Sequence, residues 1–229
     1  MPSLYQDDNG VIRALVDRLG HDLEPSILIG GWATFVRVGG EISLDIDLIT
    51  SQESRHKLEK LMTDLSPSNN HQGRKLRATI DDVHLDIYLP FESQLGRKLR
   101  LKVEVLAEYP DELSFEKWTL LRLEAHIATK MAALLDRHFS EKGQKDAREI
   151  LALLKLEGVA PAVAAEILHG ASTVDIHELP AMIGEAFDLI GKVIGLSKAD
   201  QKLVAAAKKA WVNELQLRRS GPQELRPRL

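Results

Sequence analysis

Apolar and polar residues alternate strictly through residues 42–48, ISLDIDL, and this pattern restricts what the segment can form. A period of two is typical of a β-strand with one buried face. Asp45 and Asp47 are therefore expected to leave the same face of that strand, close together. Two carboxylates about 4 Å apart repel each other by roughly 4 kcal/mol at an effective dielectric constant near 20. A strand that carries both needs either solvent or a cation beside it.

A third aspartate lies in a segment with the same alternation, residues 83–89, VHLDIYL. This segment and residues 77–80 are predicted to form two strands around a turn at Asp81 and Asp82. A neighbouring strand would present Asp86 on the side that carries the first two aspartates. Three packed carboxylates favour a cation, and Mg²⁺ is a hard ion that often shares such oxygen sites with substrate phosphates. The alternative is that the Asp-x-Asp pair belongs to a solvated strand face.

Paired glycines precede these aspartates. Residues 26–31, SILIGG, predict a short buried strand that ends at Gly30 and Gly31, and residues 32–38 predict a helix. Backbone N–H groups at such a turn and at the start of a helix attract anions. No third glycine follows at the offset of a dinucleotide fingerprint. A phosphate cradle next to metal-binding carboxylates indicates nucleotide chemistry.

Composition excludes several classes of protein. The chain of 229 residues has no cysteine, so disulfide frameworks and thiolate metal sites are excluded. No segment reads as a signal peptide or as a membrane span, which predicts a cytoplasmic protein without a membrane partner. The formal net charge of −4 gives no global attraction to nucleic acid, so such a partner would need local basic patches.

The pattern changes from mixed to helical along the chain. Helices are predicted over residues 11–20 and 54–65, a loop over 66–73, and a strand over 97–106. From about residue 115 the pattern is helical, and the last helix opens with Ser197 three residues before Asp200, close to a capping box. The prediction is an α+β fold, with a mixed-sheet lobe over residues 1–115 followed by an all-α lobe over 116–229 that completes the cleft. The predicted 97–106 strand carries a basic stripe of Lys98, Arg100 and Lys102. The arginine-rich C-terminal tail, residues 217–229, is expected to fray.

Two motifs together resemble a known superfamily. GGW, a spacer of twelve residues and then DID resemble the signature of the polymerase-β-type nucleotidyltransferases, and HLDIYLP matches their third carboxylate strand. The segment KMAALLDRHFSEKGQKDAREIL is similar to the corresponding segment of AbiEii-type nucleotidyltransferases, which include the MenT-like toxins. The resemblance covers roughly residues 25–155.

This resemblance implies roles for individual residues. Asp45 and Asp47 would hold Mg²⁺, while Asp86 would bind a second metal ion and help to deprotonate the acceptor hydroxyl. The two glycines, Gly30 and Gly31, would cradle the NTP triphosphate. Lys130 would reach the phosphates from the helical lobe, and Asp146 would orient it or contact the acceptor.

Two positions depart from the family pattern. Glu41 stands where many relatives have a basic residue before the Asp-x-Asp motif, which leaves Arg37 or Lys130 to supply that phosphate contact. Glu149 replaces the second aspartate of the helical motif and keeps its carboxylate.

The resemblance implies a metal-dependent enzyme that transfers NMP from NTP to an RNA acceptor, with tRNA favoured. Such an enzyme would act as the toxin of a pair, restrained by a cognate antitoxin protein. Two alternatives stay open. One is an enzyme that modifies a small molecule such as an aminoglycoside or lincosamide. The other is a degenerate, non-enzymatic nucleotide-binding module, which retention of all three aspartates disfavours.

Overall fold

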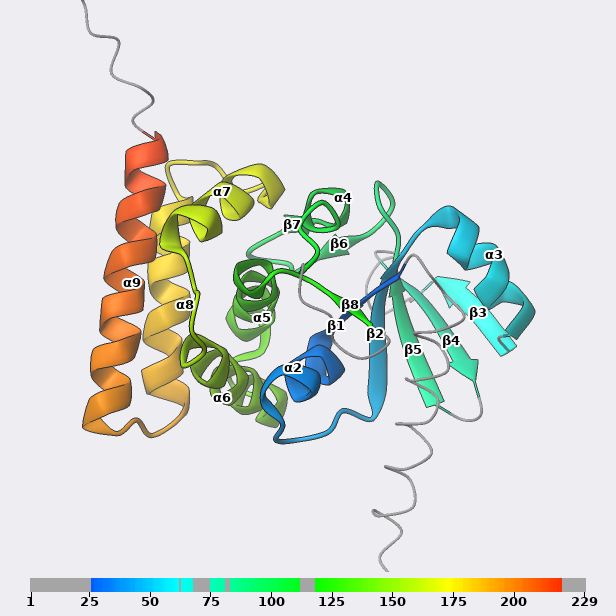
Figure 1. The fold of residues 1–229 in the computed structure, drawn as a ribbon, viewed down its shortest axis with the longest axis horizontal. Coiled ribbons are helices and arrows are strands. Elements are labelled where there is room, and N and C mark those ends of the chain that lie inside the picture. Colours follow the sequence, from blue (N-terminus) through cyan, green and yellow to red (C-terminus); the bar gives the residue numbers. More distant parts are fainter. Residues whose placement is uncertain (1–25, 62, 68–74, 81–82, 112–117, 220–229) are drawn as a thin grey trace, which may run out of the picture.

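The computed structural model describes residues 26–61, 63–67, 75–80, 83–111 and 118–219. The sheet is built mainly from the N-terminal half of the chain, and helices make up the C-terminal half (Figure 1). The predicted α+β fold is thus confirmed. The helix predicted over 11–20, the turn at Asp81 and Asp82, most of the 66–73 loop and the end of the arginine-rich tail lie outside the described residues.

One mixed sheet of six strands carries the predicted aspartates. Its order is β3-β4-β5-β2-β1-β8, and neighbours are antiparallel except for the parallel pairs β2–β5 and β1–β8. The strands are β1 (Ser26–Ile29), β2 (Asp45–Thr50), β3 (Thr63–Pro67), β4 (Leu76–Ile80), β5 (Val83–Tyr88) and β8 (Thr119–Leu120). The β2–β5 register places Asp47 directly beside Asp86.

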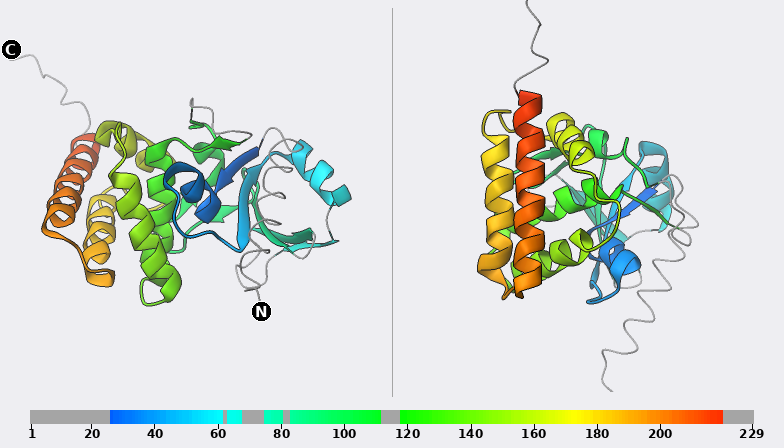
Figure 2. Two further views of the ribbon diagram at one scale, coloured as in Figure 1. Left: turned by 60° about the horizontal axis from the view of Figure 1, so that its bottom comes forward. Right: turned by 60° about the vertical axis from the view of Figure 1, so that its left-hand side comes forward.

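Short helices flank the sheet, and longer ones form the rest of the molecule. The first three are α2 (Gly30–Val38), α3 (Gln52–Leu61) and the single turn α4 (Val103–Leu106). The others are α5 (Leu123–Arg137), α6 (Glu141–Leu154), α7 (Pro161–Ala171), α8 (Leu179–Val193) and α9 (Lys198–Arg219). Helices α8 and α9 form an outer layer, and α5 and α6 lie between that layer and the sheet (Figures 1 and 2). The predicted cap is present, because the Ser197 hydroxyl accepts a hydrogen bond from the Asp200 N–H at 3.1 Å.

The two faces of β2 and β5 pack against different hydrophobic cores. Leu48 and Leu85 point into a core that also contains Trp32 of α2. On the other face, Ile49 and Tyr88 join the larger core built by the C-terminal helices. Since side chains alternate along a strand, the face with the aspartates is turned toward the helical part of the protein.

One predicted helix ends early, and one predicted strand is wrong over most of its length. The helix predicted over 54–65 ends at Leu61, and the chain then enters β3, because residues 63–67 pair with β4. The strand predicted over 97–106 is extended only at Leu101–Lys102 (β7), which pairs with β6 (Gln94–Leu95), and α4 follows at once. Leu99, Leu101 and Val103 are nevertheless fully buried. The alternating pattern therefore predicted the buried residues correctly but the extended backbone incorrectly.

Strand β8 was not predicted from the sequence. It pairs with β1, although it follows the predicted lobe boundary. The division into lobes at residue 115 stays a prediction. Among the described residues, none of the helices combines the length and apolar character that crossing a bilayer requires.

Candidate nucleotide and metal site

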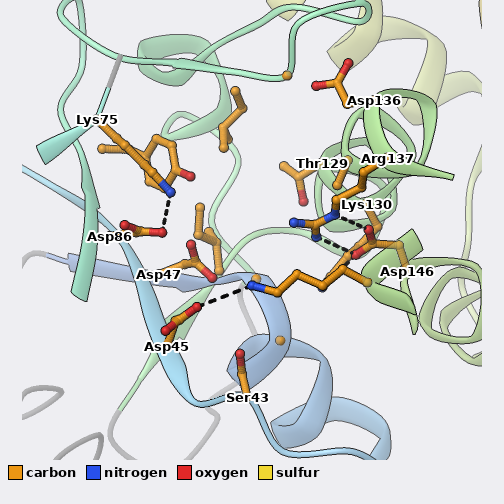
Figure 3. A pocket seen from close by; sticks show the side chains of 18 of the residues that line it. Ser43, Asp45, Asp47, Lys75, Asp86, Thr129, Lys130, Asp136, Arg137 and Asp146 are labelled. Atoms are coloured by element: carbon orange, nitrogen blue, oxygen red, sulfur yellow. Dashed lines mark hydrogen bonds and ion pairs between the residues drawn. The ribbon is translucent and has the colours of Figure 1, made fainter. Parts of the chain in front are cut away.

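A cleft of about 390 Å³ lies between the sheet and helices α5 and α6 (Figure 3). It brings together most of the predicted site residues, which come from α2, β2, β5, α5 and α6. The predicted residues that line it are Gly30, Gly31, Asp45, Asp47, Asp86, Lys130 and Asp146.

The glycine turn packs directly against one of the aspartates. Gly30 has φ +69°, and a Cβ atom built on it would lie 2.1 Å from Oδ2 of Asp47. A Cβ on Gly31 would lie 2.8 Å from Cβ of Ser43. Only glycine fits both positions, so the absent side chains let the start of α2 approach the carboxylate. No side-chain hydrogen bond caps α2 within the described structure, and its first turn contains no acidic residue. Its N-terminal N–H groups are thus suited to an anion.

Lys145 of α6 brings a positive charge to the same turn. Its Nζ lies 3.7 Å from the Cβ position built on Gly31, and it donates a hydrogen bond to the Ile42 carbonyl at 3.2 Å. That partner is neutral, so the ammonium charge remains available to an anion. The position of Lys145 against the turn depends on how α6 packs, so the local sequence pattern does not reveal it.

The predicted pair Lys130 and Asp146 belongs to a buried network between α5 and α6. Lys130 Nζ donates to Glu149 Oε2 at 2.5 Å and lies 3.9 Å from Asp146 Oδ1. Asp146 instead accepts two hydrogen bonds from Arg137, at 2.7 and 2.9 Å. Burial raises the pKa of Glu149, and the Lys130 charge opposes that shift. Lys130 therefore lines the cleft with its charge already matched by Glu149.

Asp86 is surrounded by two cations that sequence reasoning missed. Lys75 Nζ donates to Asp86 Oδ2, and Arg77 Nε donates to Oδ1 at 3.0 Å. Arg77 lies directly opposite Asp86 in the β4–β5 register, and Lys75 immediately precedes β4. Both oxygens predicted to bind a second metal ion are thus engaged by basic side chains.

Two positions singled out near the Asp-x-Asp motif lie outside the cleft. The buried Arg37 guanidinium pairs with Asp111 at 2.5 Å and donates to the Leu121 carbonyl, so the structure does not bring it to the glycine turn. Glu41 pairs with Arg148 at the surface, at 3.3 Å. Near Asp45 the basic group is Lys142 of α6, whose Nζ lies 3.7 Å from Asp45 Oδ2.

The cleft perturbs the acidity of Asp47. Burial, and then repulsion from Asp86, raise the pKa of Asp47 to about 6, against the opposing charges of Lys75 and Lys130. Among the described residues, no side chain donates a hydrogen bond to its carboxylate. An ionised Asp47 therefore lacks a direct partner, and a cation at this point would stabilise it.

These residues fit one divalent ion better than two. The carboxylates of Asp45 and Asp47 leave the same strand face and are the hard oxygen donors that Mg²⁺ prefers. Asp86 fits poorly as a ligand, because Lys75 and Arg77 already neutralise its charge and would repel a metal ion. In the parts of the chain that the structure describes, no group of three acidic, histidine or cysteine side chains is arranged to hold a metal ion.

The comparisons with known proteins are sparse. The sequence matches no protein-family model and no curated protein. One solved structure that the fold resembles is that of the antibiotic-resistance factor ANT(2'')-Ia in solution, with a TM-score of 0.45 and 19% sequence identity. The match covers 72% of this chain and 90% of that chain. The assignment of a function to this chain therefore rests on the geometry of the cleft.

Replacing Gly30 with alanine should destabilise the protein far more than replacing Gly39. Both glycines have nearly the same positive φ, +69° and +70°, so both variants incur the cost of a side chain in a sparsely populated backbone region, on the order of 1–3 kcal/mol. Only Gly30→Ala also collides with Asp47, since nothing lies within 4 Å of a Cβ on Gly39. Urea unfolding measures the difference. Equal losses in the two variants would contradict the close approach of the turn to Asp47.

Asp47→Asn should stabilise the metal-free protein at neutral pH. The pKa of Asp47 is higher in the folded state, about 6 against 3.8, so folding stability falls as pH rises through this interval. Two pKa units correspond to about 3 kcal/mol at pH 7.5, which the asparagine removes. Urea unfolding in EDTA should show that gain at pH 7.5 and a much smaller one at pH 4.5.

The exposed Glu185 on α8 offers the control for this measurement, and Glu185→Gln should change little at either pH. An Asp47→Asn protein that is less stable than the wild type at pH 7.5 would refute the electrostatic account.

Proposed function

We propose that the protein is a metal-dependent nucleotidyltransferase of the polymerase-β type, which transfers NMP from NTP to an acceptor hydroxyl and releases pyrophosphate. The observation that carries this proposal is the contact between the Gly30 turn and Asp47, with Lys145 at the same turn. An anion-binding turn and a carboxylate with a raised pKa occupy adjoining positions. A ligand that is both polyanionic and metal-bound, such as Mg²⁺–NTP, satisfies both at once.

The cleft offers each part of the nucleotide a partner. The triphosphate would lie at the Gly30–Gly31 turn, where the α2 N-terminus and Lys145 neutralise its charge. Asp45 and Asp47 would hold Mg²⁺, which, when bound, polarises the phosphate oxygens and offsets the negative charge of the transition state. Lys142 lies close enough to Asp45 to contribute a second positive charge at this end of the cleft.

The reaction requires positioning rather than a covalent intermediate on the protein. The acceptor oxygen bonds to the α-phosphorus while the bond from that phosphorus to pyrophosphate breaks. Lys130 would stabilise the developing phosphate charge through the field of its ammonium group, which already acts on Asp47. Asp146 would act indirectly, by holding Arg137 at the cleft wall through two hydrogen bonds. Asp86 could take the acceptor proton on an oxygen lone pair beside its hydrogen bonds with Lys75 and Arg77.

For the acceptor we propose RNA, with tRNA favoured, and a role as a toxin restrained by an antitoxin protein. The support is the resemblance to AbiEii-type enzymes together with a basic segment at the cleft. Arg97 lines the cleft, and Lys98 and Arg100 beyond it are exposed. The Asp136 carboxylate accepts hydrogen bonds from the N–H groups of Arg97 and Lys98, at 2.7 and 2.9 Å, and so fixes this segment to α5. Exposed cations held at a fixed place suit a phosphate backbone.

Incubation of the protein with total RNA and each labelled NTP tests this function. We expect label on an RNA band with at least one NTP, dependent on Mg²⁺ and absent from Asp45→Asn. Lys145→Ala should require at least tenfold more NTP, since hydrogen bonds to charged groups contribute about 1.5–3 kcal/mol. Arg148→Ala is the matched control on α6, because Arg148 pairs with Glu41 outside the cleft.

The acceptor and the chemistry can fail separately in this assay. Label on an aminoglycoside or lincosamide, with none on RNA, would contradict the RNA acceptor and keep the transfer reaction. Nucleotide binding without label on any acceptor would favour the non-enzymatic module.

A further inference from the structure

We propose that Lys75 supplies, beside Asp86, the positive charge that a second divalent ion would bring, so that the cleft holds one ion only, at Asp45 and Asp47. The inference deepens the proposed function and rests on it. It concerns which cations neutralise the three aspartates.

The ammonium group of Lys75 is held in a fixed position beside Asp86. Its ammonium donates to Asp86 Oδ2 and lies 5.9 Å from the centre of the Tyr88 ring, a cation–π distance. Lys75 is 7% exposed and Asp86 is 5% exposed, so the pair is shielded from solvent. A buried ion pair is costly to break by removing one partner, because the remaining charge is left without compensation. Figure 3 shows the side chains of Lys75 and Asp86 next to each other in the cleft, joined by a dashed line.

Arg77 closes the other side of Asp86. Its Nε donates to Asp86 Oδ1 at 3.0 Å, and the two residues are register partners on β4 and β5. A metal ion bound to Asp86 would therefore lie close to both basic groups. Repulsion between a divalent ion and these two positive charges opposes such binding.

Among the described residues, Asp45 and Asp47 have no buried basic partner comparable to the Lys75 that pairs with Asp86. Lys142 lies 3.7 Å from Asp45, and its side chain is 70% exposed. Within the described residues, no basic group forms an ion pair with Asp47. The negative charges of Asp45 and Asp47 therefore remain available to a metal ion, whereas the charge of Asp86 is neutralised by Lys75 and Arg77. The three aspartates divide into a metal-binding pair and a carboxylate neutralised by the protein.

Electron paramagnetic resonance of Mn²⁺ counts the bound ions without depending on catalysis. Free Mn²⁺ gives a strong spectrum that is lost on binding, so titration of the wild-type protein with Mn²⁺ alone yields the number of ions per chain. We expect one ion, which is lost in Asp45→Asn. In Lys75→Met we expect a second ion, and in Lys75→Met combined with Asp86→Asn the number should return to one.

Two variants separate the position of Lys75 from its charge. Lys75→Arg keeps a positive charge next to Asp86 and should still bind one ion. Lys142→Met removes a cleft lysine that faces Asp45 instead, so it should strengthen binding without raising the count above one. Circular dichroism checks that each variant is folded. If Lys75→Met does not fold, the wild-type count still decides the proposal.

Each result has a defined meaning. Two ions per wild-type chain, or a single ion in folded Lys75→Met, would overturn the role of Lys75 and leave the proposed transfer reaction intact. A wild-type chain that binds no Mn²⁺ would contradict the metal-dependent function itself.

Discussion

Repulsion between carboxylates on adjacent strands is the constraint on which the cleft depends. The parallel pairing of β2 and β5 fixes Asp47 beside Asp86, and Asp45 precedes Asp47 on the same face. The protein surrounds this negative charge with cations from β4, α5 and α6, while the glycine turn closes over Asp47. The pKa of Asp47 is raised to about 6, which identifies the point where the protein's own charges do not suffice. In the proposed function, a metal ion with a bound phosphate chain would complete the charge balance there.

The helical part contributes position as much as charge. Lys145 and Lys142 of α6 reach the turn and Asp45, because α6 lies across the cleft from the sheet. The buried pair Lys130–Glu149 and the pair between the exposed Arg137 and the buried Asp146 join α5 to α6 near these groups. Buried ion pairs often add little net stability, since desolvation offsets the attraction. Their role is better described as fixing the geometry of one cleft wall.

Much of the site could be predicted from local patterns. Strand alternation located the three aspartates, and the paired glycines located the turn. The predicted hairpin even contained the register that places Arg77 opposite Asp86, because a two-residue turn at Asp81 and Asp82 pairs these positions. That signal went unused. The place of Lys145 depends on helix packing, which no local pattern encodes. Likewise, the helical pattern around Arg37 cannot show that its guanidinium pairs with Asp111 rather than with a phosphate.

The measurement that tests the central claim most directly is the affinity of the protein for each NTP with Mg²⁺ and with EDTA, by calorimetry. If the Gly30 turn and the carboxylates of Asp45 and Asp47 form one site, at least one NTP should bind at least tenfold more tightly with Mg²⁺. This advantage should disappear in Asp45→Asn. Equal affinities with Mg²⁺ and with EDTA in the wild-type protein would contradict the account, since the carboxylates would then repel the triphosphate that the turn attracts.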